Sequence, residues 1–144
     1  DFTDNHPLVK SGVERFRATQ GRFSPVVIDV VYDHVLASNW HRFHPRELDG
    51  FTQEVYGKLD AMSNHFPKPV EQYFPYMKEQ NWLYNYRFEW GLLKSLQGLD
   101  RRTSVDTQMH LAVDVYLAHQ NEYLMEFETF IQDAKKMVKS YLAD

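Results

Sequence analysis

The sequence predicts an all-α fold, and two observations support this prediction. Apolar residues recur at spacings of three and four along each long segment, which is the pattern of one helix face. No segment alternates apolar and polar residues as a half-buried strand would. The chain has 144 residues, so we expect one compact multi-helix domain over residues 1–144.

The first predicted helix lies near the start of the chain. Asn5 or His6 can cap a helix whose first turn contains Pro7, where a missing N–H costs little. Gly21 is expected to end this helix, because glycine readily adopts the backbone conformation found just past a helix terminus.

The segment from Val26 to Trp40 is predicted to be a second helix, capped by Ser24. Its many valines would also suit a strand, but fifteen residues without a breaker exceed the usual strand length. Apolar residues occupy nearly its whole circumference, which is typical of a helix buried at the centre of a domain. We therefore expect this helix to be central.

An apolar stripe predicts a third helix. Phe51, Val55, Leu59 and Met62 follow one another at spacings of four, four and three. Asp49 lies just before the stripe and is expected to cap the helix.

Three shorter helices are predicted before the last one. The first begins near Val70 and contains Pro75, which is expected to bend or split it. The other two cover residues 81–86 and 89–97, and Gly98 is expected to end the second of them.

The remainder of the chain predicts a long amphipathic helix. No glycine or proline follows Gly98. A continuous helix over residues 106–142 would be about 55 Å long, which is long for a compact domain. We therefore expect a bend near residues 119–121.

Composition excludes several classes of protein. The chain has no cysteine, which excludes disulfides and cysteine zinc sites and agrees with a cytoplasmic location. No apolar run reaches the ~18 residues of a membrane span. The net charge of −4 and the lack of a basic face argue against a nucleic acid partner. We therefore expect a cytoplasmic protein that binds neither membrane nor nucleic acid.

The predicted central helix carries an unusual group of polar residues. Asp29 and Asp33 are four residues apart and share one helix face, and His34 follows directly. Two carboxylates in an apolar helix repel each other and are costly to bury unless they are paired or bind a metal. Carboxylate and imidazole ligands suit Mn, Fe, Zn or, with more waters, Mg. These residues are therefore candidates for a metal or catalytic site.

A second interpretation of this group stays open. Asp29 and Asp33 can instead be buried partners of arginines, and His34 can be a hydrogen-bonded histidine of the core. The protein would then be a non-catalytic helical binding module, with aromatic residues lining a groove for its partner.

Four motifs, in order along the chain, resemble one known family. They are Phe2-Thr3-Asp4-Asn5-His6-Pro7, then Asp29-x-x-Tyr32-Asp33-His34-x-Leu36-Ala37-x-x-Trp40, then Gln80-Asn81-Trp82-Leu83 with Tyr86, and finally Leu96-x-Gly98-x-x-Arg101-Arg102. The family is that of the acyl carrier protein phosphodiesterases, which is similar to the HD-type metal-dependent phosphohydrolases. The similarity runs from residue 2 to the last helix and implies a helical, HD-like fold.

The resemblance also implies an activity. Members of this family are hydrolases that release 4′-phosphopantetheine from holo-acyl carrier protein by cleaving a phosphodiester at a serine. The implied cofactor is Mn²⁺ or Mg²⁺, and the implied partner is holo-acyl carrier protein. An HD-like hydrolase of another small phosphodiester is the alternative within this class, because fold resemblance does not fix the substrate.

The candidate site residues combine the resemblance with the chemistry of a phosphodiester. The expected metal ligands are Asp29, Asp33 and His34. The expected catalytic residues are Asp33 and His34 with Asp4. Arginines can hold phosphate or an acidic carrier protein, and aromatic rings can line a groove. The candidates for substrate binding are Arg101, Arg102, Arg22 and Trp82.

One departure from the family pattern affects the expected activity. Family members usually carry a further segment, with a His-Arg-x-Ile-Asp motif, before the motif that starts at Phe2. We therefore expect an N-terminally truncated relative that folds but is weak or inactive as an enzyme. A second copy could cover apolar surface left exposed in this way, so a homodimer is also expected.

Overall fold

A computed structural model describes residues 2–143, and every regular element within them is a helix. This confirms the all-α prediction. The α-helices are α1 (Phe2–Asn5), α2 (Pro7–Gln20), α3 (Ser24–Ser38), α4 (Leu48–Ala61), α5 (Lys68–Glu79), α6 (Trp82–Asn85), α7 (Glu89–Arg102), α8 (Ala112–Ala118) and α9 (Gln120–Ala143). Short 3₁₀ turns link several of them: η1 (Gly21–Phe23), η2 (Trp40–Arg42), η3 (Ser63–His65) and η4 (Met109–Leu111).

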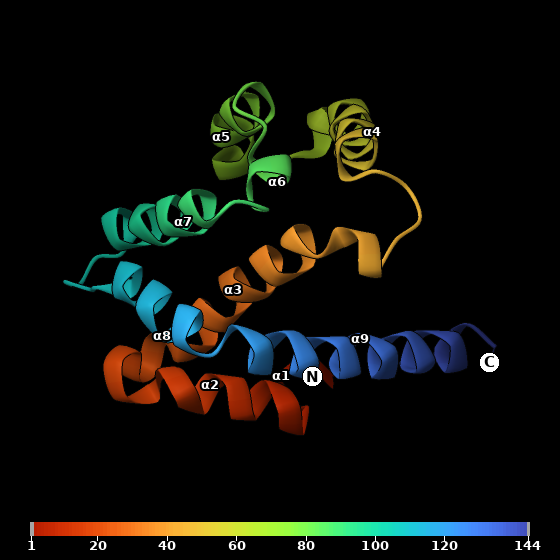
Figure 1. Ribbon diagram of the computed structural model, residues 1–144. Coiled ribbons are helices and arrows are strands. Elements are labelled where there is room, and N and C mark those ends of the chain that lie inside the picture. The colour runs from red at the N-terminus through yellow and green to blue at the C-terminus, as the bar shows by residue number, and fades with distance from the viewer. Residues whose placement is uncertain (1, 144) are drawn as a thin grey trace.

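Helix α3 lies at the centre of the main helical group (Figure 1). It packs against α2 and α9 on one side and against α7 on the other. Helices α4, α5 and α6 contact one another and form a second group above α3 and α7. The turn from α6 into α7 joins the two groups, and this turn borders the candidate site.

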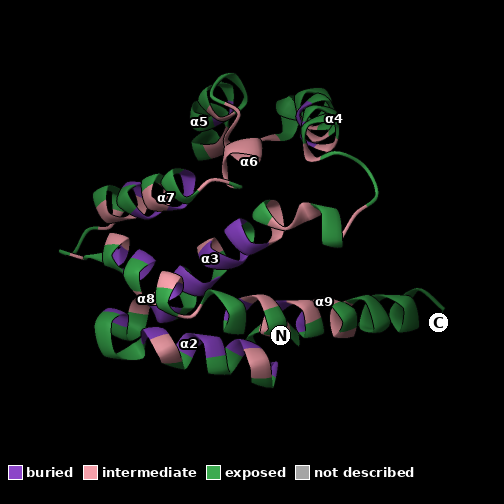
Figure 2. Cartoon of the chain, viewed as in Figure 1, coloured by how far each residue is buried: buried purple, intermediate pink, exposed green. Residues whose placement is uncertain are grey.

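The core gathers on the inner faces of α2, α3, α7 and α9 (Figure 2). Val27 and Val31 of α3 are fully buried, which confirms that this helix is central. On α2, Gly12 allows close packing, because an added Cβ would lie 3.0 Å from Ile28 Cδ1 and 3.3 Å from Tyr123 Cε1. Burial of such large apolar side chains is the main force that holds the helices together.

The start of α2 forms as the sequence predicts. His6 caps the helix, since its Nδ1 accepts a hydrogen bond from the backbone N–H of Leu8 at 3.2 Å. Its Nε2 therefore donates to the carboxylate of Asp133 at 2.8 Å, which ties the start of α2 to α9. Pro7 occupies the first turn, and Gly21 ends the helix with a φ of 52° that favours glycine.

Helix α4 corrects two predictions. Its N-cap is Glu47, and Asp49 lies inside the first turn. The predicted stripe packs only in part: Phe51, Val55 and Leu59 are half-buried, Met62 beyond the helix end is 55% exposed, and the fully buried residues of α4 are Thr52 and Tyr56. The Tyr56 hydroxyl accepts a hydrogen bond from the backbone N–H of Leu83, so contact with α6 decides which face turns inward.

Helix α7 is longer than predicted, because Gly98 does not end it. The helix continues to Arg102, and Gly98 is buried within it. Glycine inside a helix costs about 1 kcal/mol relative to alanine, which local packing can offset. Asp100 contributes stabilising contacts of this kind, since its carboxylate accepts hydrogen bonds from the backbone N–H groups of Met109 and His110. As a result, Arg101 and Arg102 occupy the last turn of α7.

The C-terminal region bends where the sequence predicts but begins later. Helix α8 ends at Ala118, and α9 begins at Gln120, so the break falls at His119. The segment from residue 106 to 108 is not helical. No helix within residues 2–143 is both long and apolar enough to cross a membrane.

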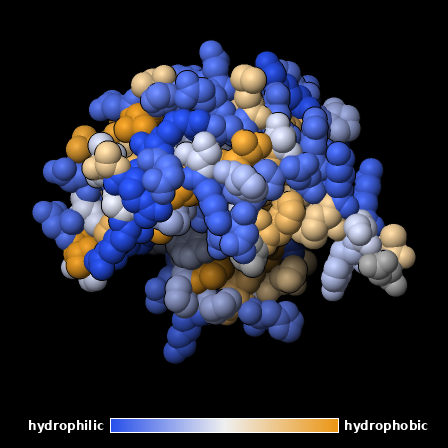
Figure 3. All heavy atoms as spheres, turned by 90° about the horizontal axis from the view of Figure 1, so that it is seen from below, coloured by the Kyte–Doolittle hydropathy of each residue, from blue (hydrophilic) through white to orange (hydrophobic). Residues whose placement is uncertain are grey.

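The end of α9 extends past the neighbouring helices (Figure 1). Several apolar side chains in this part of α9 are exposed: Met137, Val138, Tyr141 and Leu142. Elsewhere, the face seen from below carries scattered apolar side chains among hydrophilic ones (Figure 3). The expected homodimer stays a prediction.

Candidate functional site

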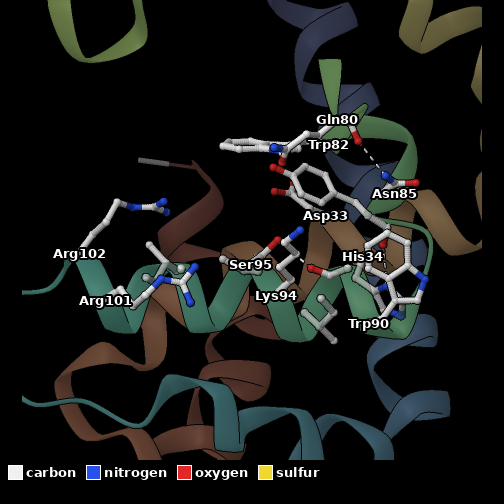
Figure 4. Close-up of a pocket in the computed structure, with 16 residues that line it drawn as sticks. Asp33, His34, Gln80, Trp82, Asn85, Trp90, Lys94, Ser95, Arg101 and Arg102 are labelled. Atoms are coloured by element: carbon white, nitrogen blue, oxygen red, sulfur yellow. Dashed lines mark hydrogen bonds between the residues drawn. The ribbon is translucent and has the colours of Figure 1, made fainter. Parts of the chain in front are cut away.

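A pocket of about 300 Å³ opens between α3, α6 and α7 (Figure 4). Residues from distant parts of the chain line it. From α3 come Val30, Asp33 and His34; from α6 and the turns on either side of it come Gln80, Trp82, Asn85 and Tyr86; from α7 come Trp90, Gly91, Leu92, Lys94, Ser95, Gly98, Leu99, Arg101 and Arg102. The pocket therefore combines acid–base groups, aromatic rings and cations.

Asp33 presents a carboxylate to this pocket from the outward face of α3. Its side chain is open to solvent, yet the pocket walls displace much of the water around it. This partial burial, and then repulsion from Asp29 one turn earlier, raises the pKa of Asp33 to about 6. Burial and the charge of Asp4 raise the pKa of Asp29 as well. Among the described residues, neither Asp29 nor Asp33 forms an ion pair, so the structure does not support the alternative in which these carboxylates are buried partners of arginines.

His34 is buried and held in one orientation. Its Nδ1 lies 2.7 Å from the backbone carbonyl oxygen of Tyr86, and its ring meets Tyr116 edge-on at 5.4 Å. Because a carbonyl oxygen can only accept a hydrogen bond, Nδ1 carries the proton and Nε2 keeps a free electron pair. Burial lowers the pKa of His34, although the Tyr86 carbonyl and Glu89 oppose this effect. The imidazole is therefore neutral at pH 7 and can accept a proton.

The position of the Tyr86 carbonyl depends on a close approach at Gly91. An added Cβ at Gly91 would overlap the carbonyl oxygen of Asn85 and come within 3.0 Å of its carbonyl carbon. Glycine therefore lets the turn between α6 and α7 pack directly against the first turn of α7. The same turn is fixed from the other side, because the side-chain amide of Asn85 donates to the carbonyl of Gln80 at 2.9 Å.

Three cations lie along the α7 side of the pocket. Lys94 and Arg101 share one face of the helix, and Arg102 follows directly. All three line the pocket, and no carboxylate among residues 2–143 forms an ion pair with any of them. Terminal nitrogens of Arg102 and Arg101 lie 3.5 Å and 3.7 Å from the position of a Cβ at Gly98. Most other arginines have carboxylate partners, including Arg15, Arg17, Arg42 and Arg46. Unpaired cations at a pocket suit an anionic ligand.

Aromatic rings form the remaining wall. Trp82 stacks on Tyr73, with ring centres 6.1 Å apart, and its indole N–H donates to the side chain of Gln80 at 3.1 Å. Trp90 is 52% exposed and stacks on Phe88. Burial and the nearby charge of Asp33 raise the pKa of Tyr86 to about 12, so its hydroxyl is a hydrogen-bond donor at neutral pH.

The structure brings together some of the predicted site residues and separates others. Those that line the pocket are Asp33, His34, Trp82, Arg101 and Arg102. Asp29 lies one turn from Asp33 and outside the lining. Asp4 belongs to α1 and does not line the pocket, and its charge contributes to the raised pKa of Asp29. Arg22 belongs to η1, where it contacts the ring of Phe23, and it does not line the pocket.

Several lining residues were not predicted. Lys94 is seven residues before Arg101, so it would have been found on the same face had α7 been continued through Gly98. Trp90 and Ser95 carry no distinctive spacing. Tyr86 belongs to the third family motif. It contributes through its backbone carbonyl, which any residue type would supply, so its identity could not reveal this role.

The expected metal site does not assemble from the described residues alone. Within residues 2–143, no three His, Asp or Glu side chains lie close enough together to hold a metal ion. His34 uses Nδ1 for the Tyr86 carbonyl, and Asp29 does not line the pocket. A Mn²⁺ or Mg²⁺ cofactor therefore stays a prediction.

Comparisons with known proteins point to one family. The family model described as acyl carrier protein phosphodiesterase matches residues 1–134. A curated protein of that name from Photorhabdus laumondii is 28% identical, over 70% of this chain and 52% of the relative. Those from Yersinia pestis and Enterobacter sp. are 32% and 29% identical, over 70% and 73% of this chain and 53% and 55% of the relatives. The chain thus spans about half the length of the curated relatives it matches. No solved structure matches it.

The close approach at Gly91 predicts a large effect of a small substitution. Gly91→Ala should destabilise the protein by about 2 kcal/mol, because the new methyl group overlaps backbone atoms that cannot move without breaking the turn. Urea unfolding measures this change. Gly57→Ala on α4 is the matched control, since an added Cβ there meets nothing within 4 Å and alanine should be neutral or stabilising. Equal unfolding midpoints for the two variants would contradict the packing described here.

The raised pKa of Asp33 predicts a pH-dependent effect on stability. The folded pKa, about 6, lies above the ordinary value of 3.8, so ionisation of Asp33 destabilises the fold. Asp33→Asn should therefore raise the melting temperature at pH 7. This gain should shrink as the pH falls from 6 to 4, because the carboxyl becomes protonated in the folded parent and begins to be protonated in the unfolded chain. Asp114→Asn, the same substitution at an exposed site on α8, is the control. A gain that persists unchanged at pH 4 would contradict the assignment.

Proposed function

Since this chain belongs to the acyl carrier protein phosphodiesterase family, we propose that it hydrolyses the phosphodiester between a serine of holo-acyl carrier protein and 4′-phosphopantetheine. The observation that carries the proposal is that Asp33 and His34 line the same pocket. That pocket also has aromatic walls and three cations without carboxylate partners among the described residues. Hydrolysis of a phosphodiester with an organic arm can use each of these features: acid–base groups for the proton transfers, cations for the phosphate and aromatic walls for the arm.

Asp33 and His34 have the proton affinities that hydrolysis requires. His34 is neutral at pH 7, so Nε2 can take a proton from the water whose oxygen bonds to phosphorus. Asp33 has a pKa of about 6, so roughly a tenth of it is protonated at pH 7. In that form it can give its proton to the serine oxygen as the bond from phosphorus to that oxygen breaks. The products are the serine hydroxyl and free 4′-phosphopantetheine.

The rest of the pocket supplies groups for binding the substrate. Arg101 and Arg102, together with Lys94, can hold the phosphate or acidic side chains of the carrier protein. Trp82 and Trp90 offer apolar faces to the pantetheine arm. Arg22 and Asp4 lie outside this arrangement, so we assign them no contact with substrate.

The proposal also has a more specific part, namely an HD-like mechanism that uses a divalent cation. The carboxylates of Asp29 and Asp33 repel each other, and a cation near them would relieve that repulsion. The described side chains do not form a complete ligand set by themselves. For this reason, the proton transfers above are assigned to protein side chains alone, and Mn²⁺ is included in the assay.

Mutation of Asp33 tests the proposed function. In the complete protein as encoded, assayed with Mn²⁺ and holo-acyl carrier protein, Asp33→Asn should lower the rate of 4′-phosphopantetheine release by ~100-fold or more. Mass spectrometry of the carrier protein follows the reaction directly. Asp114→Asn removes an exposed carboxylate on α8 and should leave the rate unchanged.

Three results would count against this assignment. Unchanged turnover in Asp33→Asn would show that the pocket is not catalytic. Carrier protein that binds the parent without losing its arm would indicate a binding module. Hydrolysis of small phosphodiesters without hydrolysis of holo-acyl carrier protein would indicate a different substrate.

A further inference from the structure

A second recess, of about 280 Å³, lies at the C-terminal end of α3, and the proposed reaction does not use it. The last turn of α3, the loop that follows it and the start of α4 form most of its lining. Arg87, from the turn between α6 and α7, completes the lining. The polar and charged side chains at this recess are His41, His44, Arg46, Glu47 and Arg87, with Ser38 at its edge.

Arg87 is fixed in a way that suits anion binding. Its guanidinium carbon lies 4.2 Å from the ring centre of Tyr84 and 4.5 Å from that of Phe88. No carboxylate within residues 2–143 forms an ion pair with Arg87. Contact with ring faces restrains a guanidinium while leaving N–H groups at its edge able to bind a planar or tetrahedral oxyanion.

The loop after α3, which also lines the recess, is preorganised as well. The indole N–H of Trp40 donates to the carbonyl oxygen of Arg46 at 2.7 Å, which closes the loop. The backbone N–H of Arg46 donates to Nδ1 of His44 at 3.1 Å. Since Nδ1 accepts this bond, Nε2 of His44 carries a proton and is a donor. The His44 ring contacts both Trp40 and Phe51, which also contact each other.

The balance of charge around the recess favours an anion. Arg46 pairs with Glu54, and Lys58 lies 3.2 Å from the same carboxylate. Glu47 is the one carboxylate among the lining residues. Arg87 therefore adds a positive charge that these neighbours do not cancel, and the two histidines add nitrogen donors.

From this arrangement we propose that the second recess binds a phosphate group, as inorganic phosphate or as the end of a small phosphomonoester. Arg87 makes the main contact through its guanidinium edge, and His44 contributes a second donor from the loop after α3. Such charge-assisted hydrogen bonds are the strong ones in proteins. The site is separate from the pocket that holds Asp33, and it does not depend on the proposed reaction.

The three tryptophans of the chain allow the two sites to be observed separately. Trp40 lines the second recess, whereas Trp82 and Trp90 line the first pocket. Titration with inorganic phosphate, followed by two-dimensional NMR of the indole N–H groups, should shift the Trp40 signal in a saturable way below ~20 mM phosphate. Sodium chloride at the same ionic strength should not reproduce this shift.

Variants of Arg87 test the assignment. Arg87→Gln should weaken the phosphate effect on Trp40 by about tenfold or more, since it removes a charge-assisted contact. Arg87→Lys should also weaken it, because lysine keeps the charge but lacks the planar fork. Arg22→Gln is the matched control: Arg22 is an exposed arginine that contacts the ring of Phe23, outside both cavities, and its loss should leave the Trp40 titration unchanged.

Two outcomes would overturn the proposal. One is a Trp40 signal that does not respond saturably to phosphate in the parent protein. The other is an equal response in the parent and in Arg87→Gln, with circular dichroism showing that the variant is folded. Shifts confined to Trp82 and Trp90 would place phosphate in the first pocket only and would likewise contradict a second site.

Discussion

The hydrogen bond between His34 and the backbone carbonyl of Tyr86 is the contact on which the candidate site depends. It joins α3, the central helix of the core, to the turn that connects α6 with α7. Apolar packing of Leu92 and Leu96 holds α7 against the core, and the His34 hydrogen bond fixes the α6–α7 turn relative to the residues that α3 presents. The same bond fixes which nitrogen of the imidazole carries the proton, so it sets both the shape of the pocket and its chemistry.

Helix α3 can both pack in the core and present the site carboxylates, because its two sides differ. Val27 and Val31 turn inward and are fully buried, so the helix is held in place by packing against α2 and α9. Asp29 and Asp33 turn outward. Partial burial raises the pKa of each, with a further contribution from Asp4 at Asp29 and from Asp29 at Asp33. Because the helix is rigid, it holds these carboxylates in fixed positions, as acid–base chemistry requires.

Features that depend on local sequence patterns were predictable, whereas features that depend on distant packing were not. The cap at His6, the end of α2 at Gly21 and the break at His119 follow from local rules, and the structure has all three. The continuation of α7 through Gly98 depends instead on contacts of Asp100 with residues nine and ten positions later.

The site shows the same division. Asp33 and His34 could be identified from the sequence. Asp33 forms an unusual acidic pair with Asp29 on an apolar helix, and His34 is adjacent to it. Lys94 was missed together with the length of α7. The contributions of Tyr86 and Gly91 are those of a backbone carbonyl and a missing side chain, which only the packing of α6 against α7 makes visible.

The protonation state of His34 is the most direct test of this account. Long-range ¹H–¹⁵N NMR correlation at pH 7 distinguishes the two neutral tautomers from the charged ring, and comparison with His34→Gln assigns the signals among the seven histidines. The account predicts a neutral ring protonated at Nδ1, with Nε2 unprotonated. A ring protonated at Nε2, or a charged imidazolium at pH 7, would contradict it.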